Sequence, residues 1–441
     1  MIKSSSRTAK SATQNLTRTW AASSPTTRAR TVRSSPYPRT ARKFQWVSRA
    51  STGSEWKQAW PSPSVYGKTC TTALWCMKSL RSCLATISTA SAFQSIKNIL
   101  KNTAPQKTLI NANTNRAINI TSYISTLQTI VEALGYHHIT AMISLHTLDP
   151  TKSGGAWYDE DSGVSEDDFL EAVDILTKNL CDSKYWNILG LDLKNEPHEC
   201  SGGGRAPDWQ KGATLIGNRM LDGCPNWLAF VEGVNGIHSV TVSDGRTNEY
   251  YDWWRGALEE AGDDLIEYNV ENKLVWAPHY YSTGVSPQWY LYAAGEWQES
   301  GIVQGYEELG DEELKANVDI TMDVMFGYLM NKTLYAMVLG EFAGLYSKDA
   351  HPKLTTKRTT DYNIEGMVER GYAGGYMWSL NPESAYQYNP ADTAGDFTEG
   401  LLEDDWLTPN KRFLEGMAAM DKIKDLRRFP CFPVELEEED D

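Results

Sequence analysis

The sequence of 441 residues predicts an α/β fold of the (β/α)8 TIM barrel type. From about Thr121 onward, apolar strand-like runs alternate with amphipathic helical stretches, and two of the runs end in a glutamate, at Glu196 and Glu341. Such alternation at this length favours a parallel barrel, whose functional groups stand at the strand ends. Six strands can be identified and a barrel needs eight. We therefore expect its first one or two strands, upstream of His138, to be missing or mistranslated.

The expected strands are short runs rich in β-branched and aromatic residues. In order along the chain they are His138–His146, Asn187–Asn195, Trp227–Glu232, Lys273–Tyr281, Tyr335–Glu341 and Gly374–Leu380. Helical stretches separate them. The clearest is Ser165–Asn179, which opens with Ser-Glu-Asp-Asp, an N-cap residue followed by acids that favour the positive end of the helix dipole.

Charge divides the chain into three expected segments: residues 1–94, a catalytic barrel over 95–430, and an acidic tail over 431–441. Before Ser95 there are 15 lysines and arginines and one acidic residue, whereas the remainder holds 27 basic and 56 acidic residues. The first segment also contains 31 serines and threonines. It is therefore either a disordered or transit-like leader or an out-of-frame translation. Glu435–Asp441 contains six acidic residues around one leucine, which is typical of a solvated tail.

Composition and missing motifs exclude several classes of function. The formal net charge of −15 argues against a nucleic-acid partner. No run of 18 apolar residues occurs, so we expect no membrane span. The sequence has no His-Glu-x-x-His, paired Cys-x-x-Cys, phosphate loop or Gly-x-Ser-x-Gly. We therefore expect neither a metal nor a cofactor.

Two glutamates carry the expected chemistry, in the segments Leu193–Pro197 and Leu339–Phe342. On strands three apart in a barrel they would face each other across its mouth, the geometry that glycoside hydrolysis needs. We expect Glu196 to be the general acid/base and Glu341 the nucleophile. Asn195 would bind the 2-hydroxyl of the sugar. The alternative for Glu196 is an ordinary surface glutamate after a strand.

Further polar and aromatic residues stand at strand ends. His279 and Tyr281 lie two apart, so both can point toward the barrel axis. The Tyr281 hydroxyl would bond the nucleophile, and His279 would contact the substrate or the acid/base. His146 ends another strand, and Trp378 would form a floor for the sugar. A histidine or tryptophan of the core is the alternative for His279 and Trp378.

These motifs resemble glycoside hydrolase family 5, the retaining cellulases, and in particular bacterial-type endo-β-1,4-glucanases. The resemblance runs from about Ser95 to Phe429 and is carried by Gly190–His198, Phe230–Gly233, Leu274–Tyr281, Leu339–Phe342, Met377–Pro382 and Gly400–Trp406. It implies Glu196 as acid/base, Glu341 as nucleophile, the other residues named above as site residues, and Trp378 in the −1 subsite. It departs from the family at Leu380, where close relatives often have a second tryptophan. The family's first two strands, with an arginine that pairs with the nucleophile, are absent as written.

The missing strands can be read one frame away. Taking the last base of each codon with the first two of the next, Trp46 followed by Val47 gives Gly, and Trp56 followed by Lys57 gives Glu. With codon degeneracy chosen freely, residues 46–73 can encode Gly-Val-Asn-Trp-Phe-Gly, and residues 88–94 can encode Asn-Cys-Val-Arg-Phe-Pro. We expect a frameshift up to about residue 94. The chain as written would then fold poorly or be nearly inactive.

The resemblance implies a β-glucan polysaccharide or oligosaccharide as the partner, and we expect a monomer. Cellulose lies outside cells, so we expect secretion, although no signal peptide is visible in the sequence as written. Outside the first segment the cysteines are Cys181, Cys200, Cys224 and Cys431, which allow three disulfide pairings. Two alternatives stay open: another β-glycan specificity (mannan, xyloglucan or β-1,3-glucan), or a catalytically silent carbohydrate-binding barrel.

Overall fold

The computed structural model describes residues 85–86, 95–105, 117–136, 139–150, 155–251, 256–263, 265–380, 382, 385–405 and 408–424. All of them belong to one compact unit, residues 42–441. The expectations for residues 1–94 and 431–441 lie outside the described residues, apart from the short strand at 85–86.

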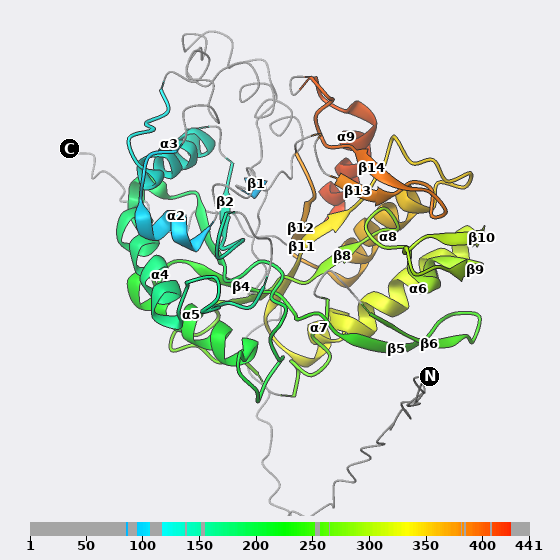
Figure 1. Cartoon of the computed structure of the whole chain (residues 1–441), viewed down its shortest axis with the longest axis horizontal. Coiled ribbons are helices and arrows are strands. Elements are labelled where there is room, and N and C mark those ends of the chain that lie inside the picture. Colours follow the sequence, from blue (N-terminus) through cyan, green and yellow to red (C-terminus); the bar gives the residue numbers. More distant parts are fainter. Residues whose placement is uncertain are drawn as a thin grey trace, which may run out of the picture. The chain divides into compact units, whose positions relative to one another are not determined.

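Eight parallel strands form one curled sheet (Figure 1). Seven of them follow one another across the sheet, and the eighth pairs beside them. The sheet is therefore an incomplete (β/α)8 barrel. In sheet order they are β1 (Ala85–Thr86), β2 (Ala141–Ser144), β3 (Ile188–Asp192), β4 (Leu228–Val231), β7 (Leu274–Trp276), β11 (Ala336–Ala343) and β12 (Gly374–Met377), with β8 (His279–Tyr281) also paired to β11. All six expected strand regions are therefore present, mostly with tighter bounds. Of the two strands expected upstream, β1 is described, and the other falls outside the described residues.

The expected strand Lys273–Tyr281 was wrong as a single element. It is broken between β7 and β8 at Ala277 and Pro278. Proline has no backbone N–H to donate to the sheet, and the Pro278 carbonyl instead accepts the N–H of Gly340 at 2.9 Å. As a result β7 pairs with both β4 and β11, whereas β8 pairs with β11 alone.

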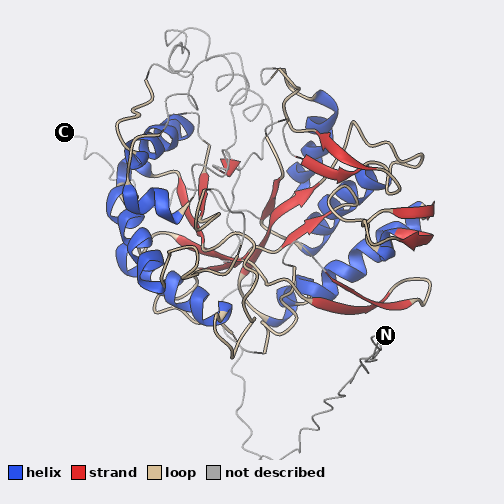
Figure 2. Cartoon of the chain, in the orientation of Figure 1, coloured by secondary structure: helices blue, strands red, loops and turns tan. Residues whose placement is uncertain are grey.

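Helices lie on the outer side of the curled sheet (Figure 2). They are α2 (Ile96–Lys101), α3 (Tyr123–Tyr136), α4 (Glu166–Leu180), α5 (Trp209–Gly223), α6 (Asp311–Met322), α7 (Leu329–Lys332), α8 (Thr355–Arg370) and α9 (Lys411–Met417). Short 3-10 turns occur at Ser183–Tyr185, Trp289–Leu291 and Ala418–Lys422, and a π-helical turn at Asp323–Gly327. The expected start of α4 is confirmed, because Ser165 caps it by accepting the N–H of Asp168 at 3.1 Å.

Three antiparallel hairpins interrupt the alternation and were not expected from the sequence. They are β5 (Ile237–Thr241) with β6 (Thr247–Tyr251), β9 (Tyr292–Trp297) with β10 (Val303–Glu308), and β13 (Ala385–Tyr388) with β14 (Ala394–Thr398). Many of their residues are exposed. This gives them little of the apolar pattern by which a buried strand is identified.

The core has two parts because successive side chains of a strand point to opposite faces of the sheet. The larger cluster joins the helices to one face of the sheet. A smaller cluster contains no helix residue and fills the other face, the barrel interior; it comprises Met142, Leu189, Leu228, Phe230, Val275, Ala277, Val338, Ala373 and Tyr376. The interior is thus filled by side chains, as expected for a barrel whose site lies at the strand ends. None of the described helices combines the length and hydrophobicity needed to cross a bilayer.

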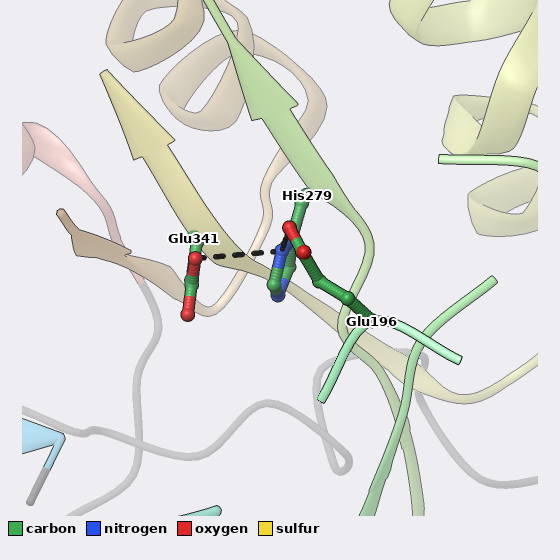
Figure 3. Close-up of side chains that lie close together, drawn as sticks. All are labelled: Glu196, His279 and Glu341. Atoms are coloured by element: carbon green, nitrogen blue, oxygen red, sulfur yellow. Dashed lines mark hydrogen bonds and ion pairs between the residues drawn. The ribbon is translucent and has the colours of Figure 1, made fainter. Parts of the chain in front are cut away.

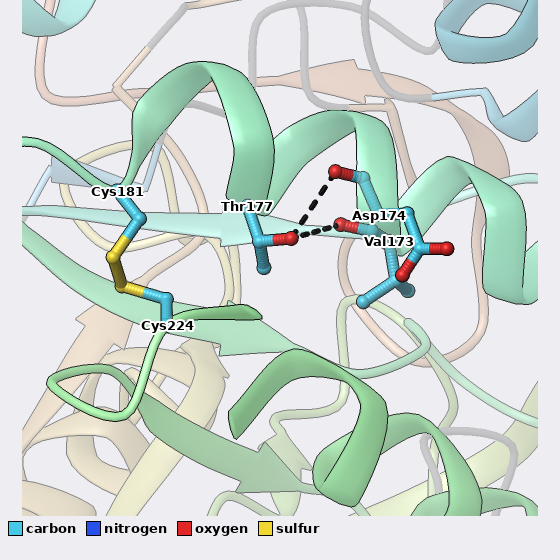
Figure 4. Close-up of a disulfide and its surroundings, with 5 residues drawn as sticks. All are labelled: Val173, Asp174, Thr177, Cys181 and Cys224. Atoms are coloured by element: carbon cyan, nitrogen blue, oxygen red, sulfur yellow. Dashed lines mark hydrogen bonds between the residues drawn. A yellow bond between two sulfur atoms is a disulfide. The ribbon is translucent and has the colours of Figure 1, made fainter. Parts of the chain in front are cut away.

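One disulfide, Cys181–Cys224, joins the C-terminal ends of α4 and α5 (Figure 4). Its Cα atoms lie 5.6 Å apart and it closes a separation of 43 residues. Three disulfide pairings were possible from the sequence. This disulfide belongs to the pairing in which Cys200 would bond Cys431. Cys431 lies outside the described residues.

Candidate active site

The ends of three strands bring the two expected glutamates and a histidine together (Figure 3). Glu196 stands in the bend after β3, His279 on β8, and Glu341 on β11. In the sheet, β3 and β11 are separated by β4 and β7, so they are three strands apart, as the sequence predicted. One side-chain atom from each of the three residues lies within 4.8 Å of the others.

His279 lies between the two carboxylates. Its Nδ1 is 3.3 Å from Glu196 Oε1 and 3.6 Å from Glu341 Oε2. Register places His279 directly beside Glu341, because β8 pairs with β11 at these two residues. Gly340 permits this approach, since a Cβ there would lie 2.4 Å from the Ala277 carbonyl oxygen and 3.0 Å from the His279 ring.

Glu341 is buried, with 8% of its surface exposed. The Tyr281 hydroxyl donates a hydrogen bond to Glu341 Oε2, which is the contact expected from the sequence. Within the part of the chain that the structure describes, its ion-pair contact is with His279 and not with an arginine or lysine.

Burial raises the pKa of Glu341 to about 8, and the like charge of Glu196 adds to the rise. The charge of His279 and the hydrogen bond from Tyr281 act in the opposite direction. Burial alone would lower the pKa of His279, but the neighbouring carboxylates outweigh it and raise this pKa well above the ordinary value. The site therefore favours a charged imidazolium beside a carboxyl group that is difficult to ionise.

His146, Asn195 and Trp378 also gather at this end of the barrel. The His146 ring stacks on the Trp378 ring, with centroids 6.0 Å apart and planes 9° from parallel. Asn195 Nδ2 lies 3.5 Å from His146 Nε2. Burial lowers the pKa of His146 to about 4, and the nearby Lys194 charge lowers it further. His146 is therefore neutral near pH 7. All seven residues singled out from the sequence thus lie in one cluster.

Three buried polar residues beneath the cluster were missed as site residues: Asp192, Lys194 and Glu232. Lys194 Nζ donates to the backbone carbonyls of His146 and Asn195 at 3.2 and 2.5 Å. Asp192 accepts from the Ser144 hydroxyl at 2.6 Å. A signal was present for Glu232, because it closes the expected strand Trp227–Glu232 as Glu341 closes its own.

The same three atoms of Glu196, His279 and Glu341 are close enough to hold a metal ion. Coordination by His279 would need a neutral ring with a lone pair on one nitrogen. Both ring nitrogens instead face carboxylates, at 3.3 and 3.1 Å, which are ion-pair distances. We therefore assign no metal to this cluster and interpret it as an acid–base site.

Comparisons with known proteins identify the family and the fold. The family model Cellulase (glycosyl hydrolase family 5) matches residues 86–384. An endoglucanase of Paenibacillus polymyxa is 28% identical over 297 residues, which cover 65% of this chain and 62% of that protein. The major extracellular endoglucanase of Xanthomonas campestris pv. campestris is 27% identical over 287 residues, covering 64% and 49%. The chain thus spans about half to three fifths of the length of these curated relatives.

Solved structures share the fold. An endocellulase variant from Pyrococcus horikoshii in complex with cellotetraose matches with a TM-score of 0.61 and 25% identity, covering 82% of this chain and 88% of that one. The catalytic domain of the Xanthomonas campestris pv. campestris endoglucanase matches with a TM-score of 0.56 and 24% identity, covering 73% and 81%. The family match spans well over half of the chain, and this chain therefore belongs to glycosyl hydrolase family 5.

Proposed function

We propose that this chain is a retaining glycoside hydrolase that cleaves internal β-1,4-glucosidic bonds of cellulose or a related β-glucan by double displacement. The observation that carries the proposal is the spacing of the two carboxyl groups, with one side-chain oxygen of each within 4.8 Å of the other. Retaining enzymes separate these groups by about 5–5.5 Å, whereas inverting enzymes leave about 6.5–9.5 Å for a water molecule. Its relatives are endoglucanases by name.

In the first step Glu341 attacks the anomeric carbon while Glu196 gives its proton to the departing glycosidic oxygen. A covalent glycosyl ester of Glu341 forms and the shortened glycan leaves. In the second step Glu196 removes a proton from water, which attacks the same carbon and releases Glu341. Two inversions at that carbon give net retention.

The surrounding residues have roles that follow from their contacts. Tyr281 and His279 stabilise the ionised form of Glu341, which is the form that attacks. Asn195 holds the 2-hydroxyl of the sugar, where hydrogen bonds strengthen in the transition state. Trp378, braced by the stacked His146 ring, forms the floor beneath the sugar in the −1 subsite.

Three measurements on a soluble β-glucan test the proposal. The first released product should be the β-anomer by proton NMR. A 2-deoxy-2-fluoro cellobioside with a good leaving group should leave a mass adduct on the peptide that contains Glu341. Glu196→Gln should lose hydrolysis of cellulose but keep the first step, a burst of leaving group, with substrates whose leaving group needs no proton, because the second step still lacks its base. An α-anomeric product or an adduct elsewhere would contradict the assignment.

A catalytically silent carbohydrate-binding barrel is the second candidate. It is favoured by the raised pKa of Glu341 and by the absence of an arginine or lysine contact to this side chain among the described residues. A binding protein would release no reducing sugar at any pH between 5 and 9, and Glu196→Gln would leave its affinity for cello-oligosaccharides unchanged. Any hydrolysis that Glu196→Gln abolishes excludes this candidate.

Specificity, location and assembly complete the proposal. We propose β-1,4-glucan as the substrate in preference to mannan, xyloglucan or β-1,3-glucan. Rates of reducing-sugar release from these four polymers test this specificity. We place the protein outside the cell as a monomer that needs no cofactor. The disulfide Cys181–Cys224 and the extracellular relative support that location, since disulfides persist in oxidising compartments. Secretion of the tagged full-length protein and its sedimentation velocity test these two points.

A further inference from the structure

Glu232 stands directly after β4 and is almost completely buried, at 1% exposed. Its backbone is held by the Trp209 indole, which donates to the Glu232 carbonyl at 2.8 Å. Trp209 opens helix α5, so the helix that follows the strand fixes the position of this residue. At this depth the carboxylate is closed off from solvent. A buried charge of this kind needs partners within the protein.

One oxygen of Glu232 accepts a hydrogen bond from the candidate active site, and the other lies at ion-pair distance from it. Oε2 accepts the backbone N–H of Glu196 at 2.9 Å. Oε1 lies 3.1 Å from His279 Nε2. The first contact matters because Glu196 has a φ of 44°, in the left-handed region that a residue with a side chain rarely adopts without support.

The second contact fixes the state of the His279 ring. Nε2 faces Glu232, while Nδ1 faces Glu196 and Glu341 at 3.3 and 3.6 Å. A neutral imidazole has a single N–H, so one nitrogen would turn a lone pair toward a carboxylate. A ring enclosed in this way is most stable when both nitrogens carry protons.

We propose that Glu232 is a positioning residue for the hydrolysis. Its carboxylate anchors the left-handed backbone of Glu196 and holds the His279 ring doubly protonated, with Nδ1 directed at the two catalytic carboxyl groups. The inference rests on the proposed function. Glu232 acts through Glu196 and His279 and does not touch the substrate.

The charge balance around His279 supports this role. Four carboxyl groups face it from the elements packed against it: Asp192 and Glu196 of the β3 end, Glu232 after β4, and Glu341 on β11. Tyr281 on β8 and His146 after β2 are the other titratable groups near the ring. Among the carboxyls, the charge of Glu232 contributes most to the raised pKa of His279. Burial and the charge of Glu232 in turn raise the pKa of Asp192 well above its usual range. Glu232 is thus the principal counter-charge of the imidazolium.

The test compares Glu232→Gln with Glu399→Gln in the full chain. Glu399 is a second glutamate that is 1% exposed and lies outside the site, so its variant controls for removal of a buried carboxylate. In the unsubstituted chain, nitrogen-15 NMR should show both His279 ring nitrogens protonated from pH 5 to 8. In Glu232→Gln the ring should titrate within that range, because one adjacent opposite charge shifts a pKa by about 1–3 units. Glu399→Gln should leave the ring unchanged.

A pH profile of kcat/KM provides the second readout. In Glu232→Gln the imidazolium charge that lowers the pKa of Glu341 is lost in part, and this loss outweighs removal of the smaller, opposing effect of the Glu232 charge. The acid limb should therefore move upward by about one pH unit. Glu232→Asp keeps the charge but shortens the reach, and should move the limb less in the same direction. A charged ring and an unmoved limb in Glu232→Gln overturn the proposal. If that variant does not fold, an unmoved limb in a folded Glu232→Asp does so.

Failure of this inference is distinguishable from failure of the proposed function. The ring titration is measured on folded protein whether or not it hydrolyses glycan. If neither the unsubstituted chain nor any variant hydrolyses β-glucan, the proposed function fails. The positioning role then fails with it, even where Glu232 determines the protonation of the His279 ring. If the parent is active but Glu232→Gln changes neither the ring nor the limb, only the positioning role is wrong.

Discussion

Two buried glutamates of this chain have opposite surroundings. Glu399 follows β14 and is enclosed by the loop after β11, whereas Glu341 lies among the strand ends of the candidate active site. Glu399 is met by donors: the backbone N–H groups of Tyr346, Ser347 and Lys348 lie 2.7, 2.8 and 3.1 Å from its oxygens, and the Asn410 side-chain amide lies at 2.8 Å. Glu341 is met by one hydroxyl, one imidazole and a second carboxyl group.

The difference separates a carboxylate that stabilises the fold from one whose surroundings suit a role in catalysis. Hydrogen bonds to the charged form offset the cost of burying it, so Glu399 can tie its loop in place. Glu341 lacks this compensation, and burial raises its pKa to about 8. A group that is costly to keep in the folded chain is typical of a functional site, where stability is given up for reactivity.

Glu341→Gln should produce the largest effect. Hydrolysis at pH 8 should fall by about four orders of magnitude, the scale on which removal of a unit of catalytic machinery acts. At the same pH the melting temperature should rise, because a buried carboxyl group beside Glu196 is replaced by a neutral amide. Reducing-sugar release and thermal unfolding measure the two effects. A variant that is both inactive and less stable would mean that Glu341 is compensated in a way similar to Glu399.

Restoring the alternative reading frame before residue 95 should have the next largest effect. The restored segment would supply the arginine that the family pairs with the nucleophile. At pH 5 a carboxyl group with a pKa of about 8 is about 0.1% ionised, so a cation that returns the pKa toward its ordinary 4.5 should raise activity by up to roughly 700-fold.

The comparison is made with the two chains assayed side by side from pH 5 to 9. Changing the restored arginine to methionine is the matched control and should return the acid limb to its position in the chain as written. Equal activity of the two chains at pH 5 would refute the frame hypothesis. Sequencing the transcript over codons 40–100 tests the reading frame directly.

Glu399→Gln should affect stability alone. The amide nitrogen of glutamine would face backbone N–H groups, and leaving donors of a buried group unsatisfied costs about 1–3 kcal/mol each time. We expect the free energy of unfolding in urea to fall by about 2–3 kcal/mol. The kcat of the folded fraction at 25 °C and its pH profile should be unchanged. A displaced acid limb would show that the loop also controls Glu341.

The residue pattern predicted the cluster because each chosen side chain lies at or just after the C-terminal end of an expected strand. Glu196, His279 and Glu341 could be identified since the C-terminal ends of parallel strands meet at one end of a barrel. Glu232 follows the same rule and was not assigned, because nothing in the sequence alone distinguishes a carboxylate that faces the substrate from one that faces a histidine beneath it. The break at Pro278 had a local signal in the proline itself.

Other features depend on distances that a sequence does not contain. The pairing of Cys181 with Cys224 required knowing that α4 and α5 end side by side. Three contacts of Glu399 join residues 51 to 53 positions apart, and these three partners are backbone groups that leave no trace in residue type. The hairpin β9–β10 is largely exposed and buries only the first residue of each strand, so no apolar alternation marks it.

The pH dependence of stability separates the two glutamates by proton binding alone. The pKa of Glu341 is about 8 in the folded chain and takes its ordinary value of 4.5 in the unfolded one. Between these values the folded state holds a proton that the unfolded state has lost. The contribution of Glu341 is therefore fully present below pH 4.5 and is lost as the pH rises to 8, by up to about 1.4 kcal/mol per pH unit.

Urea unfolding at pH 5, 6, 7 and 8 measures this slope. In Glu341→Gln the free energy of unfolding should decline less steeply from pH 5 to 8, by up to the slope that one bound proton contributes. In Glu399→Gln the curve should shift downward and keep its slope. Because the slope reports the difference in bound protons and not the number of contacts, it separates the two surroundings even where both substitutions change the midpoint. Parallel curves for the parent and Glu341→Gln would mean that Glu341 is already ionised at pH 5, and that the described residues compensate it as fully as the donors around Glu399 do.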